Sequence, residues 1–180
     1  MFVFDRIDLC ISGGFDISSR AKALSISRVG APFYGEVRDG VIYRLRNNPA
    51  APVKYPYLTV SDNTDGPVDV VMIGDLRKVR DRLKKRVKRG TGLEVVVRPA
   101  RKMNAAALGK WFDSINELYA FCHSSRCQFI LSSGAGSAYE MVSGPCLDAI
   151  LKTADIDPAN HWHKMTQWLD GKLSKRVSYA

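Results

Sequence analysis

The sequence has few of the residues that most enzymes use for acid–base and metal chemistry. Its 180 residues include three histidines, His123, His161 and His163, and none precedes residue 123. His161 and His163 are two apart in a segment with helical spacing, where successive side chains turn by about 100° and these two face different sides. We therefore expect no histidine-based metal site in this protein and assign no catalytic residue.

Cysteine is also scarce, and its spacing excludes the common structural zinc sites. The four cysteines, Cys10, Cys122, Cys127 and Cys146, form no Cys-x-x-Cys pair, whereas such sites usually need two closely spaced pairs of ligands. We expect most of these thiols to pack as small hydrophobic groups. A metal site and a disulfide, which needs an oxidising compartment, are the alternatives that remain open.

Long apolar runs are absent as well. No stretch approaches the ~20 apolar residues that a membrane-spanning helix needs. The first apolar run is interrupted by Asp5 and Asp8 before a secretory signal could form, so we expect a cytoplasmic protein without a membrane partner. Domains usually run ~100–200 residues, and a single domain over residues 1–180 is the expected organisation.

Positive charge exceeds negative charge, and the excess is concentrated in one segment. The chain holds 27 Lys and Arg against 18 Asp and Glu, a formal charge of +9. Twelve of these basic residues lie between Arg77 and Lys102, where only Asp81 and Glu94 oppose them, while the rest of the chain holds 15 basic and 16 acidic residues. Such a segment favours a polyanionic partner, because neutralising phosphates releases their counterions.

Most of this segment is predicted to be a helix that begins after the N-cap Asp75, reaches about Arg89 and ends at Gly90. Its narrow apolar stripe consists of Leu76, Val79, Leu83 and Val87. The remaining positions are nearly all basic, and like charges four residues apart destabilise a helix by about 0.2–0.5 kcal/mol per pair. This cost favours nucleic-acid binding; a merely solvated face and an acidic protein partner are the alternatives. The residues expected to contact RNA are Lys84, Lys85, Arg86, Lys88, Arg89, Arg98, Arg101 and Lys102.

Apolar runs and amphipathic segments alternate, most clearly in the second half. This pattern is typical of a parallel sheet covered by helices, either open or closed into a barrel. The predicted strands are Ile7–Ile11, ended by Gly13-Gly14, and Val68–Ile73, Leu93–Val97 and Gln128–Leu131. Helices are expected after Asn104, from Pro145, and from Asp157-Pro158 to Gly171. In the first half we predict a strand over Ala23–Val29 and a hairpin over Glu36–Tyr43, turning at Asp39-Gly40.

A loop of small residues follows the last predicted strand, where α/β proteins often bind ligands. Its sequence, Ser132-Ser133-Gly134, is neither a P-loop nor a nucleophile elbow. The backbone N–H groups make it a candidate phosphate-binding loop. A tight turn with a purely structural role is the alternative.

The same loop carries a resemblance to a known family. Residues Ile130–Met141, with the sequence ILSSGAGSAYEM, resemble the signature of archaeal ribonuclease P protein component 3, part of the ribonuclease P thirty-kilodalton-subunit family. In that family a strand ends in Ser-Ser-Gly-Ala, followed by a short acidic-aromatic stretch, Arg-Ser-Pro and a helix. Residues 69–76 and 92–99 are similar to the family's strand–helix–strand core. The family's Arg-Ser-Pro is here Val142–Pro145, without the arginine.

The resemblance implies a TIM-barrel-like (β/α) fold. Since the first half is short for its share of eight β/α units, we expect the barrel to be incomplete or distorted there. The family's function is that of a protein subunit of ribonuclease P, the ribonucleoprotein endoribonuclease whose RNA removes the 5′ leader of precursor tRNA.

The implied partners are ribonuclease P RNA and ribonuclease P protein component 2, with precursor tRNA contacted indirectly. Mg²⁺ would serve the RNA catalyst, and the protein itself would bind no cofactor. We therefore expect the isolated chain to be non-catalytic. Two alternatives stay open: a metal-dependent phosphoesterase barrel that acts on nucleic acid, and a basic module that binds an acidic protein.

Overall fold

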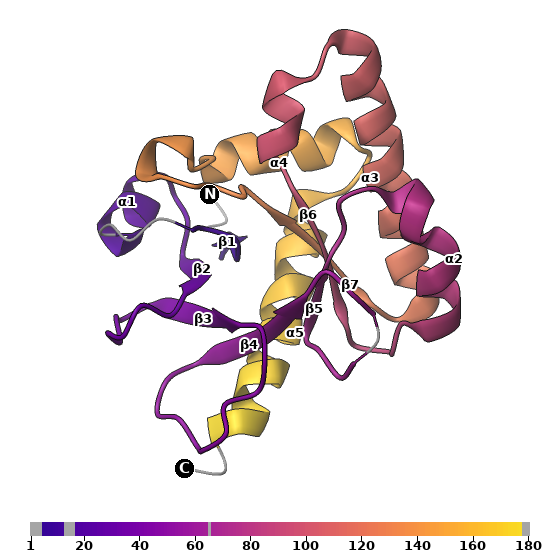
Figure 1. The fold of residues 1–180 in the computed structure, drawn as a ribbon. Helices are drawn as coiled ribbons and strands as arrows, with labels where there is room; N and C mark the ends of the chain where they lie inside the picture. The colour runs from indigo at the N-terminus through magenta and orange to yellow at the C-terminus, as the bar shows by residue number, and fades with distance from the viewer. Residues whose placement is uncertain (1–4, 13–16, 65, 178–180) are drawn as a thin grey trace.

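Seven short parallel strands form a nearly closed barrel in the computed structural model, which describes residues 5–12, 17–64 and 66–177. The strands pair in sequence order, so each lies beside the one before it (Figure 1). They are β1 (Ile7–Asp8), β2 (Arg28–Pro32), β3 (Val41–Leu45), β4 (Tyr57–Ser61), β5 (Val70–Met72), β6 (Gly92–Val96) and β7 (Gln128–Ser132). The predicted α/β, TIM-barrel-like fold is confirmed.

The barrel has a seam between β1 and β7. Just beyond these strands, Ile11 and Ala135 form a single parallel bridge, and the Ser12 N–H donates to the Ala135 carbonyl at 2.7 Å. The Ala135 N–H in turn donates to the carbonyl of Cys10 at 3.1 Å. The predicted end of the first strand at Gly13-Gly14 lies outside the described residues. These two backbone hydrogen bonds make up the bridge and link the segments that follow the first and last strands.

The helices are unevenly distributed around the barrel. They are α1 (Ile17–Ala23), α2 (Leu76–Arg86), α3 (Ala105–Ser125), α4 (Gly144–Thr153) and α5 (Pro158–Val177), with short 3₁₀ helices η1 (Arg98–Lys102) and η2 (Ala138–Glu140). Within the described residues, no helix connects β2 to β3, β3 to β4 or β4 to β5. The expectation that the barrel is irregular in its first half is therefore confirmed.

Local sequence accounts for the helix starts in the second half. The Asp75 side chain accepts from the Arg77 N–H at 3.0 Å, and Asn104 accepts from the Ala107 N–H at 2.9 Å. Both satisfy N–H groups that the first helical turn leaves without partners. These N-caps are where the sequence predicts α2 and α3 to begin.

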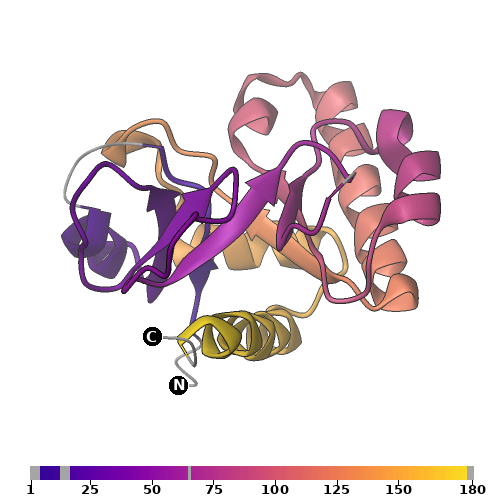
Figure 2. The ribbon, with the colours of Figure 1, turned by 60° about the horizontal axis from the view of Figure 1, so that its bottom comes forward.

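The last helix, α5, covers the amino-terminal end of the barrel. Its Trp168 indole donates to the Gly90 carbonyl just before β6 at 2.8 Å, and Arg176 donates to the Tyr57 carbonyl at the start of β4 at 3.0 Å. Lys172 lies 3.4 Å from the carboxylate of Asp69, the residue before β5. Figure 2 shows α5 lying beneath the strands. This end of the barrel is therefore covered by α5.

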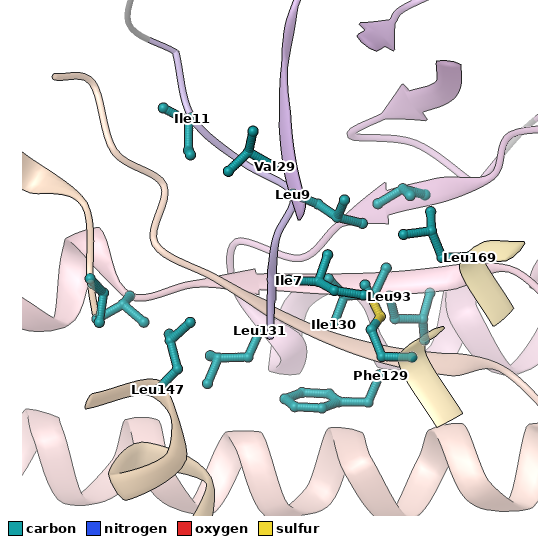
Figure 3. Close-up of a cluster of buried hydrophobic side chains, with 14 of the residues drawn as sticks. Ile7, Leu9, Ile11, Val29, Leu93, Phe129, Ile130, Leu131, Leu147 and Leu169 are labelled. Carbon is teal, nitrogen blue, oxygen red and sulfur yellow. The ribbon is translucent and has the colours of Figure 1, made fainter. Parts of the chain in front are cut away.

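Apolar side chains from the strands and helices form one continuous core. Figure 3 shows Ile7, Leu93 and Phe129 from three strands lying near Leu147 of α4 and Leu169 of α5. All five are almost fully buried. Burying a side chain of this size stabilises the fold by roughly 1.5–3 kcal/mol. Within the described residues, no helix is both long and apolar enough to cross a membrane.

Several sequence predictions about element boundaries are wrong. The first strand ends at Asp8 rather than Ile11, and α2 ends at Arg86 rather than near Arg89. The hairpin over Glu36–Tyr43 does not form, because β3 pairs in parallel with β2 and the Tyr43 hydroxyl holds the preceding segment, accepting from the Arg38 N–H at 2.6 Å. The strand predicted over Ala23–Val29 begins only at Arg28. Helix α5 continues through Gly171, because Lys172 and Arg176 beyond it bind the barrel.

Candidate nucleic-acid interface

Helix α2 has the two faces that its sequence predicts. Leu76 and Leu83 are buried against the core, with Val79 and Val87 partly buried beside them. The basic residues expected to contact RNA are all exposed: Lys84, Lys85, Arg86, Lys88, Arg89, Arg98, Arg101 and Lys102. The helix itself ends at Arg86, with Val87 as its C-cap, so Lys88 and Arg89 lie in the turn that follows.

Two cations in the first half of this basic face form ion pairs with carboxylates. Lys78 lies 3.8 Å from the Asp75 carboxylate, and Arg80 lies 3.7 Å from Glu117 on the neighbouring helix α3. Further along, no ion pair within the described residues engages the four residues Lys84, Lys85, Lys88 and Arg89. We call these four the helix group. Their uncompensated charge is free to meet an external anion.

The remaining basic residues lie elsewhere on the barrel. Arg98, Arg101 and Lys102, which we call the η1 group, directly follow the carboxyl end of β6. The helix group precedes the amino end of the same strand, because α2 returns the chain from the carboxyl end of β5. Five strand residues alone span about 16 Å. The structure therefore divides the predicted RNA-binding residues into two sites at opposite ends of β6.

The η1 group is held by contacts with η2. Arg101 donates to the Glu140 backbone carbonyl, and Arg98 Nε lies 3.6 Å from the Glu140 carboxylate. That carboxylate also accepts from the Gly136 N–H at 2.7 Å. Tyr139, between these contacts, is 91% exposed. Tyr139 lies within Ile130–Met141, the segment that carries the family resemblance, but it was not among the predicted site residues.

A buried polar network fills the carboxyl-terminal part of the barrel interior. Arg44 from β3 donates to both carboxylate oxygens of Glu94 on β6, at 3.0 and 2.6 Å, and also to the Leu9 carbonyl at 2.7 Å. The Ser132 hydroxyl donates to the same Glu94 carboxylate at 2.7 Å. No local sequence pattern predicts this network, because its members come from strands that are far apart in the chain.

Asp8 is a second buried carboxylate beside this network. One of its oxygens accepts from the Ser133 N–H at 3.0 Å and the Cys10 N–H at 3.3 Å, while Oδ2 has no hydrogen-bond partner within the described residues. Burial raises the pKa of Asp8 to about 6, and these donors only partly oppose it. Burial also raises the pKa of the Cys10 thiol to about 12, so this thiol stays protonated at neutral pH.

The candidate phosphate-binding loop is turned toward the barrel interior. Ser132, Ser133 and Gly134 are all buried, and the first two are bonded to Glu94 and Asp8. Gly134 has a φ of +67°, and a Cβ there would lie 2.8 Å from the Cβ of Val96. These contacts assign the loop a role in packing and in holding the carboxylates. Phosphate binding by this loop stays a prediction.

The thiols and histidines lie in different environments. All four cysteines are free, with Cys10 and Cys122 buried and Cys146 exposed. His161 is buried and His163 is exposed, so the two face different sides of α5. Burial lowers the pKa of His161 to about 3, which leaves its ring neutral at physiological pH. Within the described ranges, no group of three or more His, Cys, Asp or Glu side chains is arranged to hold a metal ion.

Comparisons with known proteins do not assign the chain to a family. No protein-family model matches it, and no curated protein matches it either. A function must therefore be inferred from the charge and geometry of the described residues, together with the resemblance of Ile130–Met141.

Proposed function

We propose that this chain is a protein subunit of ribonuclease P that binds the catalytic RNA through basic residues on one side of its barrel. The observation that carries this proposal is the helix group, four exposed cations that form no ion pair within the described residues. A folded surface of this charge binds a polyphosphate backbone without reading its sequence.

The barrel holds the backbone of the helix that carries Lys84 and Lys85, which suits recognition of a folded RNA. Leu76 and Leu83 on the apolar side of α2 are buried. Arg80 of α2 forms an ion pair with Glu117 of α3. In Figure 1 the two helices lie side by side. RNA helices are recognised mainly by shape and backbone. Cations carried on a helix that is packed against the barrel suit such recognition.

The barrel interior supports a binding role over a catalytic one. Both Glu94 oxygens already accept from Arg44, and the Asp8 carboxylate accepts two backbone N–H groups. These side chains are buried by the protein itself. We infer that the RNA, with its Mg²⁺, performs the cleavage of precursor tRNA, while this chain and protein component 2 stabilise the RNA.

Sequencing of the bound RNA tests whether this chain binds ribonuclease P RNA. The tagged full-length chain is purified from cells that contain it after ultraviolet cross-linking, and the attached RNA is sequenced. We expect ribonuclease P RNA to be enriched over transfer and ribosomal RNA. A different RNA would contradict the ribonuclease P assignment and keep RNA binding, whereas an acidic protein without RNA would contradict both.

Reconstitution supplies the functional readout. The chain is added to ribonuclease P RNA and component 2 at limiting Mg²⁺, and cleavage of precursor tRNA is followed. We expect the wild-type chain to raise the rate and a variant with the helix group changed to Glu to lose that effect. The matched control changes Arg20, Lys22, Lys152 and Lys175 to Glu, which alters the net charge equally at exposed positions elsewhere.

A further inference from the structure

Tyr139 is a large aromatic side chain that the protein leaves in solvent. It is 91% exposed, compared with 61% for Tyr34 and 60% for Val37, the other exposed large hydrophobic residues among those described. Exposing an aromatic ring to this degree forgoes the burial energy that such a side chain normally contributes. A ring in this position is available for contact with a ligand.

The backbone that carries this ring is fixed on both sides. Glu140 accepts from Arg101 through its carbonyl and from the Gly136 N–H through its carboxylate at 2.7 Å, and its own N–H donates to the Ser137 carbonyl at 3.1 Å. Arg98 packs over Gly136, where an added Cβ would lie 3.1 Å from the Arg98 guanidinium. The turn that carries the Tyr139 ring is therefore held in place by these contacts.

Cations surround this turn. Arg98 and Arg101 contact Glu140 directly, and both are exposed, as is Lys102 in the same 3₁₀ helix. Three cations against the single carboxylate of Glu140 leave the neighbourhood positive. An exposed ring beside exposed cations is the arrangement by which proteins bind single-stranded nucleic acid, with the base on the ring and phosphates on the cations.

We propose that Tyr139 stacks on an unpaired base of RNA while the η1 group binds the adjoining phosphates. This inference rests on the proposed RNA-binding function and adds a second site, distinct from the helix group. Bases within a duplex have both faces covered by their neighbours, so a single protruding ring selects a loop, bulge or strand end. The helix group then binds paired RNA, and Tyr139 binds an unpaired nucleotide at the other end of β6.

The test uses single-stranded RNA of on the order of 10 nucleotides and a duplex of the same sequence. Tyr139→Leu keeps apolar volume without an aromatic face, and Tyr139→Phe keeps the ring. We expect Tyr139→Leu to weaken single-strand binding by about 5-fold to 150-fold and to leave duplex binding unchanged. Tyr139→Phe should retain wild-type affinity. A 5-iodouridine in the single strand should cross-link to Tyr139, as located by mass spectrometry.

Tyr34→Leu is the control for an exposed tyrosine outside the η1–η2 contacts. Wild-type single-strand affinity in Tyr139→Leu, or an equal loss in Tyr34→Leu, would overturn the inference while duplex binding keeps the proposed function intact. If Tyr139→Leu instead loses a protein partner and retains RNA binding, the ring is a protein contact and the inference is again wrong. Failure of the wild-type chain to bind either RNA would contradict the proposed function itself.

Discussion

Asp8 lies fully buried in the barrel interior, and its burial has a consequence for stability. Its pKa is raised from an ordinary value of 3.8 to about 6. Between these values the unfolded chain releases a proton that the folded chain retains, so the free energy of unfolding falls as pH rises. The loss amounts to about 3 kcal/mol and is complete above the folded pKa. Below the ordinary pKa both states are protonated and no loss occurs.

Asp8→Asn should remove this pH dependence. The amide oxygen can still accept from the Ser133 and Cys10 N–H groups, but the side chain no longer ionises. The free energy of unfolding is measured by urea titration of both proteins from about pH 4 to about pH 7. We expect the stability of wild type relative to the variant to decline by about 2.4 kcal/mol over this range. Parallel curves would show that folding does not raise the pKa of Asp8.

Removing one partner of the Arg44–Glu94 ion pair should lower the free energy of unfolding more than replacing both residues. Arg44→Met leaves a buried carboxylate without its cation, and removing one partner of a buried pair usually costs about 3–5 kcal/mol. Adding Glu94→Leu removes the stranded charge and should restore part of that loss, though Ser132 then lacks an acceptor. Denaturant unfolding of the wild type, both single variants and the double variant measures the coupling. Additive losses would contradict a direct interaction.

Contacts between residues that meet only in the folded barrel could not be predicted from the sequence. Arg44 and Glu94 were not among the predicted site residues, because they meet only when β3 and β6 face one barrel interior. Their contact depends on the curvature of the sheet, which no local pattern encodes. Exposure of the basic residues on α2, by contrast, followed directly from the narrow apolar stripe of that helix.

At the scale of elements, the approach of β1 to β2 depends on Gly30. A Cβ at this position would lie 2.3 Å from the Leu9 carbonyl oxygen, a backbone atom that cannot move aside cheaply. We expect Gly30→Ala to destabilise the protein by about 1–3 kcal/mol or more. Gly109→Ala on α3 is the matched control, with nothing within 4 Å of the added Cβ, and should stabilise by about 0.8–1 kcal/mol. Thermal unfolding of the two variants gives the comparison, and equal effects would contradict the close strand approach.

Element boundaries were predictable where local chemistry sets them. Asp75 and Asn104 cap their helices as predicted, because a capping side chain acts within three residues. Asp39-Gly40 is a turn signal and Gly40 has a φ of +75°, yet the next strand pairs with β2 rather than folding back. Gly171 fails to end α5 for the same reason. In both cases distant contacts override a local preference.

At the scale of the whole molecule, the barrel binds its own carboxylates internally and presents cations outside. We expect the purified chain alone, with Mg²⁺ or Mn²⁺, to leave precursor tRNA uncleaved, because Glu94 is bound by Arg44 and Asp8 is buried. The assay follows 5′-leader release by gel. Specific cleavage that survives nuclease-free preparation and is lost in Asp8→Asn would instead support a phosphoesterase barrel.

The salt dependence of RNA binding tests the central claim most directly. Affinity for ribonuclease P RNA is measured at several salt concentrations for the wild type, the variant with Lys84, Lys85, Lys88 and Arg89 changed to Glu, and the control with Arg20, Lys22, Lys152 and Lys175 changed to Glu. Each phosphate neutralised in a duplex contributes about 0.9 to the slope of log affinity against log salt. Circular dichroism is used to check that each protein is folded.

We expect the helix-group variant to bind orders of magnitude more weakly, with a slope shallower by about 3–4, because four phosphate contacts are lost. The control should stay close to wild type in slope, since its cations lie outside the proposed interface. If the folded helix-group variant binds as tightly as wild type with the same slope, or if both variants lose affinity equally, α2 is a solvated face and the proposed RNA interface is wrong.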